Sequence, residues 1–447
     1  MFSRVLVANR GEIAVRVIRS LHELGIEAVA IYSTADRDSL HVRMADHAVC
    51  VGPPPAAESY LRIPSVVAAA ETTGCDAVHP GYGFLSENPA FAAACADNDL
   101  VFVGPPADVM AAMGDKIAAK QAMRAADVPT VPGTDGATNI GAARSAAEEI
   151  GFPVLLKASA GGGGKGMRLV HSADDLEDAF GTAAAEAEAA FGDSTLYVEK
   201  ALVPARHVEV QVLVDAHGNV LTLGERECSI QRRHQKLIEE SPSAALSPEL
   251  REAMETAAER ACRSVGYRNA GTFEFLLGPD GRFYFIELNA RLQVEHPVTE
   301  LVTGIDLVRE QLHIAAGEPL TITGRAPRRG HAIEIRLNAE DPDAGFRPAP
   351  GRIAHFRAPQ GPGVRVDTFV ESGSEISPYY DSMIAKLVAW DIDRDAAIAR
   401  AVRALRETVV EGIPTTRDLA LEVLASAPFR SGEYSTSTLE AMRAVPA

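Results

Sequence analysis

The sequence lacks the features that mark secreted, membrane-spanning or zinc-binding proteins. Its 447 residues include only five cysteines, far apart and without paired spacing, so neither a disulfide framework nor a zinc site is predicted. The stretch 1–7 already has the pattern of a strand, with no basic and apolar regions of a signal peptide before it. No apolar run approaches the length of a membrane span. We therefore expect a globular protein of the cytoplasm.

Basic residues are in the minority, with 43 Lys and Arg against 61 Asp and Glu and a formal net charge of −18. Proteins that bind nucleic acid or membrane surfaces show a basic face, so this balance argues against both classes. Local lysines and arginines can still bind an anionic substrate. The hydrophobic content of 47% is ordinary for a protein with large cores. The chain length suggests about three domain-sized units.

Strands and helices alternate through the N-terminal part of the chain. A buried strand is predicted at 4–9, a helix begins at Gly11, and a second strand follows at 28–32. The alternation continues to a strand at 101–103. Strands that alternate with helices in this way indicate a parallel, doubly wound sheet. A boundary between two regions of the chain is expected within residues 104–115.

Later parts of the chain mix both element types without an internal repeat. Helices are expected at 116–126, 142–150, 174–191, 394–409 and 416–426, and strands at 153–158, 167–170, 196–199, 207–214, 219–223, 332–337, 352–356, 364–368 and 386–391.

Two further strand patterns place carboxylates opposite each other. Polar side chains alternate along 287–295, and 272–276 is a second strand pattern before an Asp-Gly pair. If that pair forms a two-residue hairpin turn, Glu274 lies directly opposite Glu287. Opposed carboxylates destabilise a sheet unless a cation lies between them, and Mg²⁺ bound to phosphates is held by one or two carboxylates. The pattern favours a Mg²⁺-nucleotide site over a solvated hairpin.

A glycine run at 161–166 formally matches G-x-G-x-x-G but joins two predicted strands, whereas a dinucleotide fingerprint opens a helix. It is not a P-loop, because Gly166 stands where Ser or Thr must follow the lysine. Four consecutive glycines favour a lid that closes on a ligand over a merely flexible turn. Lys157, at the end of the strand before the run, is a candidate phosphate ligand, and so is Lys116 at a helix start.

Six strings in order resemble the biotin carboxylases, a family with the ATP-grasp fold. They are Val7–Ala14, His79–Asn88, Gly161–Met167, Arg226–Lys236, Glu287–Pro297 and Asp381–Leu387. The resemblance extends from residue 2 to about residue 440. It implies an α/β (α+β ATP-grasp) protein with a Rossmann-like N-terminal domain at 1–114, an ATP-grasp domain at 115–330 whose glycine-rich lid subdomain covers about 132–203, and a C-terminal biotin carboxylase domain at 331–447.

The resemblance also implies a reaction, the first half-reaction of acetyl-/acyl-CoA carboxylase. ATP, with Mg²⁺ or Mn²⁺, phosphorylates bicarbonate to carboxyphosphate, and the carboxyl group passes to N1 of biotin. No Ala/Val-Met-Lys-Met string for biotin attachment occurs, so we expect biotin on a separate biotin carboxyl carrier protein, with separate carboxyltransferase subunits and a homodimer of this chain. Another ATP-grasp carboxylate-amine ligase, a silent nucleotide-binding protein, and a domain of a longer multidomain carboxylase are the alternatives. The final acceptor is not encoded here.

The resemblance implies that residues between Lys116 and Asn289 bind the nucleotide and the metal. Glu274, Glu287 and Asn289 are the expected Mg²⁺ ligands. The expected ATP contacts are Lys116, Lys157, the lid amides of Gly163 and Gly164, the adenine hinge Glu199, Lys200 and Leu202, and His207, Gln231 and His234 near the sugar and phosphates.

Arg291, Gln293 and the N–H group of Val294 are expected to bind bicarbonate, and Glu295 to deprotonate it as a general base.

Biotin and carboxyphosphate are assigned to another group of residues. Lys236 would neutralise carboxyphosphate, and Arg336 would stabilise the enolate oxygen of deprotonated biotin. Tyr82 and Gly83 are placed near the biotin entrance. We interpret Cys228 as a small buried residue rather than as the partner of Lys236 in a base pair.

Overall fold

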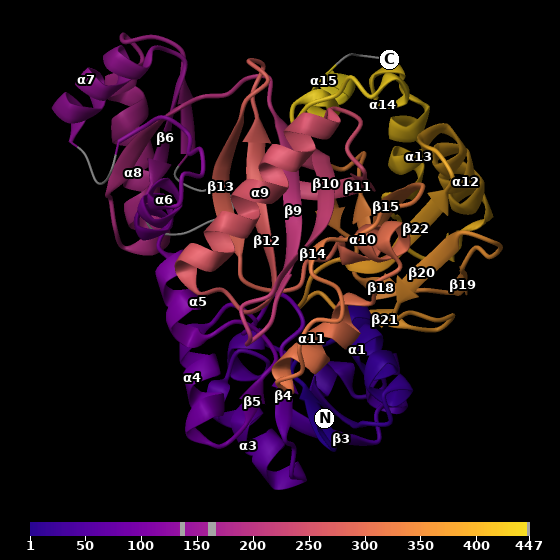
Figure 1. Cartoon of the computed structure of the whole chain (residues 1–447). Helices are drawn as coiled ribbons and strands as arrows, with labels where there is room; N and C mark the ends of the chain where they lie inside the picture. The colour runs from indigo at the N-terminus through magenta and orange to yellow at the C-terminus, as the bar shows by residue number, and fades with distance from the viewer. Residues whose placement is uncertain (135–138, 160–166, 445–447) are drawn as a thin grey trace.

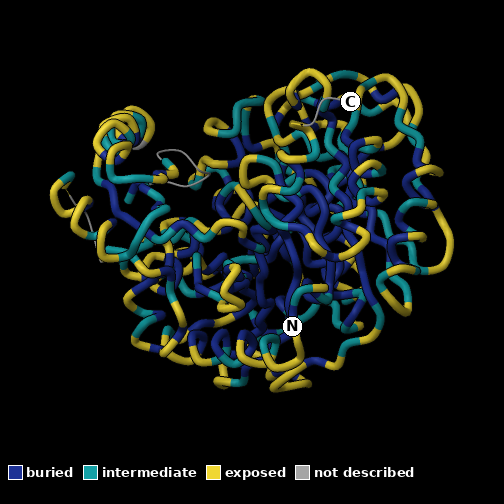
Figure 2. Tube along the Cα trace, turned by 90° about the horizontal axis from the view of Figure 1, so that it is seen from above, coloured by how far each residue is buried: buried dark blue, intermediate teal, exposed yellow. Residues whose placement is uncertain are grey.

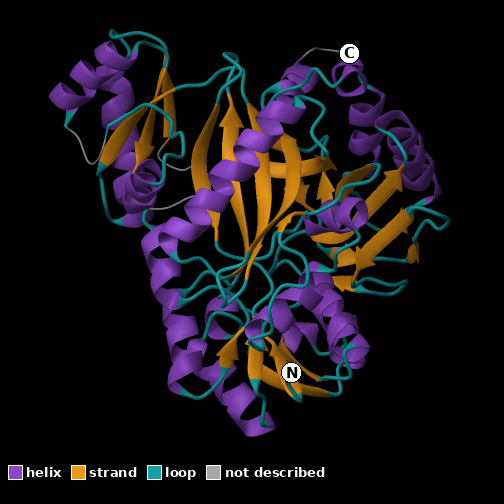
Figure 3. Cartoon of the chain, viewed as in Figure 1, coloured by secondary structure: helices purple, strands orange, loops and turns teal. Residues whose placement is uncertain are grey.

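The computed structural model describes residues 1–134, 139–159 and 167–444 (Figure 1). The chain forms an N-terminal α/β unit, a small unit at the upper left of the view, and a large central sheet that continues into the C-terminal part (Figures 1 and 3). The strands of the central sheet are mostly buried, and exposed residues gather on peripheral helices and loops (Figure 2). No helix in these ranges is long and apolar enough to cross a bilayer.

The N-terminal unit confirms the predicted parallel sheet, with strand order β3-β2-β1-β4-β5. The edge strand β3 was not predicted. Most of its residues are exposed or half-exposed and only Val51 is buried, so the strand lacks a clear apolar pattern. The elements are β1 (Arg4–Val7), α1 (Gly11–Glu23), β2 (Glu27–Ser33), η1 (Thr34–Asp36), α2 (Leu40–Met44), β3 (His47–Gly52), η2 (Ala56–Glu58), α3 (Ile63–Thr73), β4 (Ala77–His79), α4 (Pro89–Asp97), β5 (Val101–Phe102) and α5 (Ala107–Gly114).

The small unit has its own core and a three-stranded antiparallel sheet, β7-β6-β8. The predicted glycine lid connects β6 to β7, and these two strands pair directly in an antiparallel hairpin. The glycine run therefore does not connect a strand to a helix, as a dinucleotide-binding fingerprint would. Residues 161–166, and with them Gly163 and Gly164, lie outside the described residues. The elements here are α7 (Ile140–Ile150), β6 (Val154–Ala158), β7 (Met167–Val170), α8 (Leu176–Phe191) and β8 (Leu196–Lys200). The helix α6 (Lys116–Ala125) precedes this unit and packs through Ala119 and Met123 in the core of the central sheet.

The central sheet runs in the order β13-β12-β9-β10-β11-β15-β22-β20, with β14 beside β10. Because β11 pairs with β15, hydrogen bonding continues across the expected domain boundary at residue 330. Its elements and those around it are β9 (Arg206–Val214), β10 (Val220–Arg232), β11 (Gln235–Ser241), α9 (Pro248–Val265), β12 (Asn269–Leu277), β13 (Phe283–Asn289), α10 (His296–Thr303), α11 (Leu307–Ala315), β14 (Gly324–Arg325), β15 (His331–Asn338), β20 (Val364–Thr368) and β22 (Met383–Asp391).

The C-terminal part adds short strand pairs and further helices. The predicted strand at 352–356 is wrong as one element, because it divides into β18 and β19, which pair with different partners. The elements are β16 (Glu340–Asp341), β17 (Arg347–Pro348), β18 (Gly351–Arg352), β19 (His355–Arg357), β21 (Glu375–Ile376), α12 (Arg394–Glu407), β23 (Val409–Glu411), α13 (Arg417–Ala425), α14 (Ala427–Ser431) and α15 (Thr438–Ala444).

Apolar and polar side chains alternate along β9, so the sheet has an apolar face and a charged face. Val208, Val210 and Val212 pack in one core with residues of α9, such as Met254. The residues between them, including Glu209, point to the opposite face. The helix therefore covers one side of the strands, and the charged side is left for the site.

The hairpin β12–β13 has the predicted pairing of Glu274 with Glu287, but it reaches this register differently. The turn has three residues, because the Gly278 N–H donates to the Arg282 carbonyl at 2.9 Å. Near the turn the strands are therefore offset by one residue from the predicted register. An irregularity at Ile286 restores that register before Glu287 is reached. The two departures from a simple hairpin cancel.

The predicted strand through 287–295 is wrong beyond Asn289, where β13 ends. Residues 290–295 form a loop that leads into α10. Tertiary contacts fix this loop: the Leu292 side chain is fully buried, and the Ala290 N–H donates to Glu87 Oε1 at 2.9 Å. The polar residues of the loop are placed by these contacts and not by the pleat of a strand.

Candidate active site

One cavity of about 940 Å³ collects residues from every part of the chain. The predicted site residues that line it are Tyr82, Gly83, Lys116, Lys157, Glu199, Leu202, His207, Gln231, His234, Lys236, Glu274, Glu287, Arg291, Gln293, Val294 and Arg336. Three other predicted residues, Lys200, Asn289 and Glu295, do not line it. The cavity is therefore built between the N-terminal unit, the small unit, the central sheet and the C-terminal part.

A row of charged side chains crosses the central sheet at this cavity. Arg226 pairs with Glu209, Glu209 with Glu274, and Glu274 with Glu287 on successive strands β10, β9, β12 and β13. Three adjacent carboxylates repel one another unless cations lie among them. Arg226 Nε lies 2.5 Å from Glu209 Oε1, and Lys236 Nζ lies 2.6 Å from Glu209 Oε2 and 2.9 Å from Glu274 Oε1.

Glu287 ends this row without a cation of its own. Among the described residues its carboxylate has no hydrogen bond or ion pair, and it opens to the cavity. Desolvation by the walls of the cavity and the neighbouring Glu274 raise the pKa of Glu287, although His207 and Lys116 oppose the shift. Two opposed, acceptor-only carboxylates fit a Mg²⁺ ion. Asn289 is held differently, because its Oδ1 accepts from Arg291 Nη2 at 2.9 Å.

Replacing Glu287 should therefore weaken metal binding. We expect Glu287→Gln to raise the Mg²⁺ concentration for half-maximal ADP release by about tenfold or more, since a charged ligand becomes neutral. A Mg²⁺ titration at saturating ATP measures this change. The surface variant Glu252→Gln, whose carboxylate pairs with exposed Arg325, is the control. An unchanged Mg²⁺ requirement in Glu287→Gln would remove Glu287 from the metal site.

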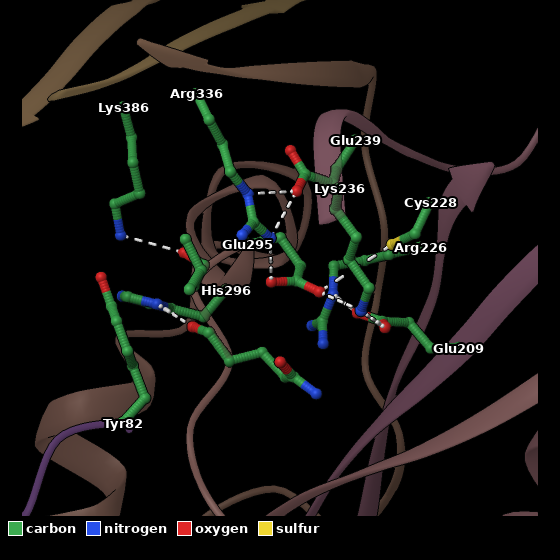
Figure 4. Close-up of polar contacts among 12 residues, drawn as sticks. Tyr82, Glu209, Arg226, Cys228, Lys236, Glu239, Glu295, His296, Arg336 and Lys386 are labelled. Carbon is green, nitrogen blue, oxygen red and sulfur yellow. Dashed lines mark hydrogen bonds and ion pairs between the residues drawn. The ribbon is translucent and has the colours of Figure 1, made fainter. Parts of the chain in front are cut away.

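Glu295 immediately precedes α10 and is fully buried. Its Oε1 lies 2.5 Å from Lys236 Nζ, and its Oε2 lies 2.9 Å from Arg336 Nη2 (Figure 4). Burial by itself raises the pKa of Glu295, but Lys236 and Arg336 outweigh it and hold the pKa well below the usual value. The carboxylate is ionised and is held at the edge of the cavity by the two cations that line it.

The loop beside Glu295 is held by side chains from distant parts of the chain. Lys386 Nζ donates to the Val294 carbonyl at 2.9 Å, which fixes the orientation of that peptide (Figure 4). Arg291 donates from Nε to Glu87 Oε2 at 2.8 Å and from Nη1 to Gln293 Oε1 at 2.9 Å. Glu87 was not predicted as a site residue, although it lies within the string His79–Asn88.

Lysines line the part of the cavity near the small unit. Lys157 Nζ lies 2.6 Å from Glu199 Oε2, and Lys120 pairs with the other oxygen of Glu199. Burial and the charge of Lys116 lower the pKa of Lys157 to about 8. A buried cluster of cations favours an anionic ligand such as a polyphosphate. Lys120 was missed in the sequence, although its spacing of four residues from Lys116 on one helix was a usable signal.

Lys200 is positioned away from this cluster. Its Nζ donates to the Gly151 carbonyl at 2.8 Å and to the Phe152 carbonyl at 3.0 Å. Glu199 next to it uses its side chain, rather than only its backbone, to hold two lysines of the cavity.

Replacing Lys120 should therefore weaken ATP binding more than replacing Lys200. Burial and the neighbouring Lys157 lower the pKa of Lys120 to about 7, and a bound polyphosphate would favour its charged form. We expect Lys120→Met to raise the Kd for ATP about tenfold or more, because this hydrogen-bond donor is lost from the cavity. Lys200→Met should change that Kd far less. Isothermal titration with ATP measures both values. Equal affinities of Lys120→Met and the unchanged protein would contradict this assignment.

Two further groups complete the site. His207 Nε2 lies 3.0 Å from Glu274 Oε2; burial lowers the pKa of His207, but Glu274 outweighs burial and raises it. Cys228 Sγ lies 3.9 Å from Glu295 Oε1, and burial raises the pKa of this thiol well above its usual value. Cys228 is therefore a protonated, buried thiol rather than a base.

Comparison with known proteins identifies the family. The model of the biotin carboxylase N-terminal domain matches residues 1–110, that of the carbamoyl-phosphate synthase L chain ATP-binding domain matches 115–323, and that of the biotin carboxylase C-terminal domain matches 334–441. A biotin carboxylase from Nostoc sp. is 53% identical over 443 residues, covering 99% of each chain. This chain belongs to the biotin carboxylase family.

Other relatives agree over the full length. A pyruvate carboxylase subunit from Methanothermobacter thermautotrophicus is 51% identical over 99% of this chain and 90% of its own length. The crystal structure of a Campylobacter jejuni biotin carboxylase in a nucleotide complex has a TM-score of 0.96 and 47% identity over 99% of both chains. Like its family, this chain is a ligase that carboxylates biotin with bicarbonate and ATP. A structure of a 2-oxoglutarate carboxylase biotin carboxylase domain from Hydrogenobacter thermophilus, 46% identical to this chain, is described as a complex with MgADP and bicarbonate.

Proposed function

We propose that Glu295 and Arg336 of this chain serve different steps of the reaction. Glu295 deprotonates bicarbonate, and Arg336 stabilises deprotonated biotin. The observation that supports this division is the position of the Glu295 carboxylate between Lys236 and Arg336, both of which line the cavity. The residue roles follow from what each side chain can donate, accept or neutralise there. The three domains are assigned to 1–114, 115–330 with the lid at about 132–203, and 331–447.

In the first step, Glu295 accepts the proton of bicarbonate and one bicarbonate oxygen attacks the γ-phosphorus of ATP, so that ADP leaves. Arg291, Gln293 and the Val294 N–H would hold the bicarbonate. An anion bound beside Lys236 and Arg336 competes with Glu295 for these cations, which raises the affinity of Glu295 for a proton. Bound Mg²⁺, held by Glu274 and Glu287 with Asn289 beside them, would neutralise charge on the phosphates.

In the second step, carboxyphosphate beside Lys236 gives up its carboxyl group, and phosphate leaves. N1 of biotin loses its proton to the departing phosphate and forms a bond to the carboxyl carbon. The guanidinium of Arg336 stabilises the negative charge that develops on the ureido oxygen. Tyr82 and Gly83 line the side of the cavity on which biotin would enter.

The nucleotide occupies the other end of the cavity. Lys116, Lys120 and Lys157 would hold its phosphates, together with the lid amides of Gly163 and Gly164. Leu202 and the backbone of Glu199 and Lys200 would contact the adenine. His207, Gln231 and His234 would contact the sugar and phosphates.

The biotin is proposed to arrive on a separate biotin carboxyl carrier protein, and the carboxyl group to leave through a carboxyltransferase. The pyruvate carboxylase relative and those named biotin carboxylase are about equally similar to this chain. The carboxyltransferase partner, and not this chain, is proposed to select the final acceptor. A related 2-oxoglutarate carboxylase domain is described as a dimer, and a homodimer is proposed here.

ADP release by the purified chain tests the proposal. With Mg²⁺ and ATP, we expect release to require bicarbonate and to increase with free biotin. Bicarbonate dependence without any response to biotin or to a biotinylated carrier would redirect the proposal to another acceptor. ATP binding without ADP release under every condition would overturn it.

A further inference from the structure

Two buried carboxyl groups lie opposite each other behind Arg336. Glu239 on β11 is in direct register with Glu334 on β15, and both are fully buried. Glu239 Oε1 accepts from Arg336 Nε at 2.6 Å (Figure 4). Among the described residues, Glu239 Oε2 and both oxygens of Glu334 have no hydrogen-bond partner. Two carboxylates in this arrangement, both ionised, would repel each other without compensation.

Besides Arg336, two lysines face the pair, but both are bound to other acceptors, and Lys236 is paired with Glu209, Glu274 and Glu295. The charged or titratable groups that face it are Tyr82, Cys228, Lys236, Glu295, Arg336 and Lys386. Lys386 lies 3.2 Å from Glu12 and donates to the Val294 carbonyl, so it is shared among several acceptors.

The groups on the adjoining elements add no free cation either. Burial holds the pKa of His296, at the start of α10, well below its usual value, so this imidazole is neutral. Arg365 on β20 is paired with Glu300 of α10 at 2.6 Å and with Asp367 at 2.7 Å.

The titration of the two carboxyls agrees with this geometry. Burial raises the pKa of Glu239 to about 7, although Arg336 opposes the shift. Burial also raises the pKa of Glu334 well above its usual value, and the neighbouring Glu239 adds to the effect. Near neutral pH one carboxyl of the pair therefore keeps a proton.

We propose that Glu239 and Glu334 form a positioning pair that carries one proton in total. This pair holds Arg336 in place for the carboxylation of biotin. Ionised Glu239 binds Nε and Nη2 of Arg336, while neutral Glu334 removes the repulsion that would push Glu239 away. With Glu295 on the other side, the guanidinium is fixed in one plane. Its Nη1 has no partner among the described residues and stays available to the substrate. This inference rests on the proposed role of Arg336.

Two amide variants separate the members of the pair. Glu239→Gln should lower biotin-dependent turnover about 10- to 100-fold, because Arg336 loses a charged partner. Bicarbonate-dependent ADP release without biotin should change much less. Glu334→Gln should lower biotin-dependent turnover less than about threefold, because a neutral amide replaces a neutral acid of the same shape. Equal losses in the two variants, or no loss in Glu239→Gln, would overturn the proposal.

The pH profile gives a readout that a merely structural role would not move. As the pH falls through about 7, Glu239 takes up a proton and releases Arg336, so the ratio of biotin-dependent to biotin-independent ADP release should fall in the unchanged protein. In Glu239→Gln the ratio should be low and flat. In infrared spectra at neutral pH, the carbonyl band of a protonated carboxylic acid should be present and should weaken in Glu334→Gln. A band unaffected by this substitution contradicts a proton on Glu334.

The variant Arg336→Ala distinguishes failure of this inference from failure of the proposed function. If biotin-dependent turnover survives in Arg336→Ala, the role of Arg336 itself is wrong. If turnover is lost there but unchanged in Glu239→Gln, only the positioning pair is wrong.

Discussion

Replacing Glu295 by glutamine should lower bicarbonate-dependent ADP release about 10²- to 10⁴-fold, which is the usual contribution of a general base. The amide has nearly the same shape, and its oxygen can still accept a hydrogen bond from one of the two cations, Lys236 or Arg336, but it cannot accept the proton of bicarbonate. The measurement is ADP release at saturating ATP and bicarbonate, with ATP affinity determined separately. The Kd for ATP should stay unchanged, since Glu295 pairs with Lys236 and Arg336 and not with the lysine cluster around Glu199.

A matched control for this result is Cys228→Ala. Its thiol lies 3.9 Å from Glu295 Oε1 and remains protonated because burial raises its pKa. Turnover in Cys228→Ala should therefore stay close to that of the unchanged protein. Retained turnover in Glu295→Gln together with a loss in Cys228→Ala would assign the base to Cys228 instead.

The second large effect is expected for Arg336. Arg336→Ala should lower biotin-dependent turnover about 10²- to 10³-fold, the range found when an oxyanion-stabilising donor is removed. Steady-state turnover against the concentration of free biotin measures this loss, and it should appear mainly in kcat. Isothermal titration should show ATP binding unchanged, because Arg336 interacts with Glu239 and Glu295 and not with the lysine cluster.

Arg336→Lys serves as the matched variant. Lysine keeps the positive charge but cannot bind Glu239 and Glu295 with one planar fork while presenting a further donor. We expect turnover between those of Arg336→Ala and the unchanged protein. Biotin-dependent turnover that survives Arg336→Ala would show that the ureido oxygen is stabilised by another group.

The sequence predicted the elements whose local signals are strong. Alternating strands and helices in the N-terminal part indicated the parallel sheet, and the strands around the glycine run formed the predicted hairpin. The opposition of Glu274 and Glu287 was also predicted, although the assumed two-residue turn was wrong. A longer turn and a later irregularity shifted the register in opposite senses, and side-chain patterns do not reveal such compensating shifts.

Other features were missed because no local pattern encodes them. The loop after Asn289 looked like a strand, since its polar and apolar residues alternate, yet Glu87 and Lys386 fix it from distant parts of the chain. Lys120 belongs to the cavity because of its contact with Glu199, which comes from another element. The pair of Glu239 and Glu334 exists only because β11 and β15, far apart in the sequence, lie side by side.

By itself, the sequence determined the family and the reaction, because motifs record which chemical groups are present. Tertiary structure decided which of these groups meet. It placed Glu295 between two cations, moved the Lys200 side chain away from the cavity, and set a carboxyl pair behind Arg336. Burial and charge at a site depend on neighbours from distant segments, so the ionisation of these groups follows from the fold and not from the order of residues.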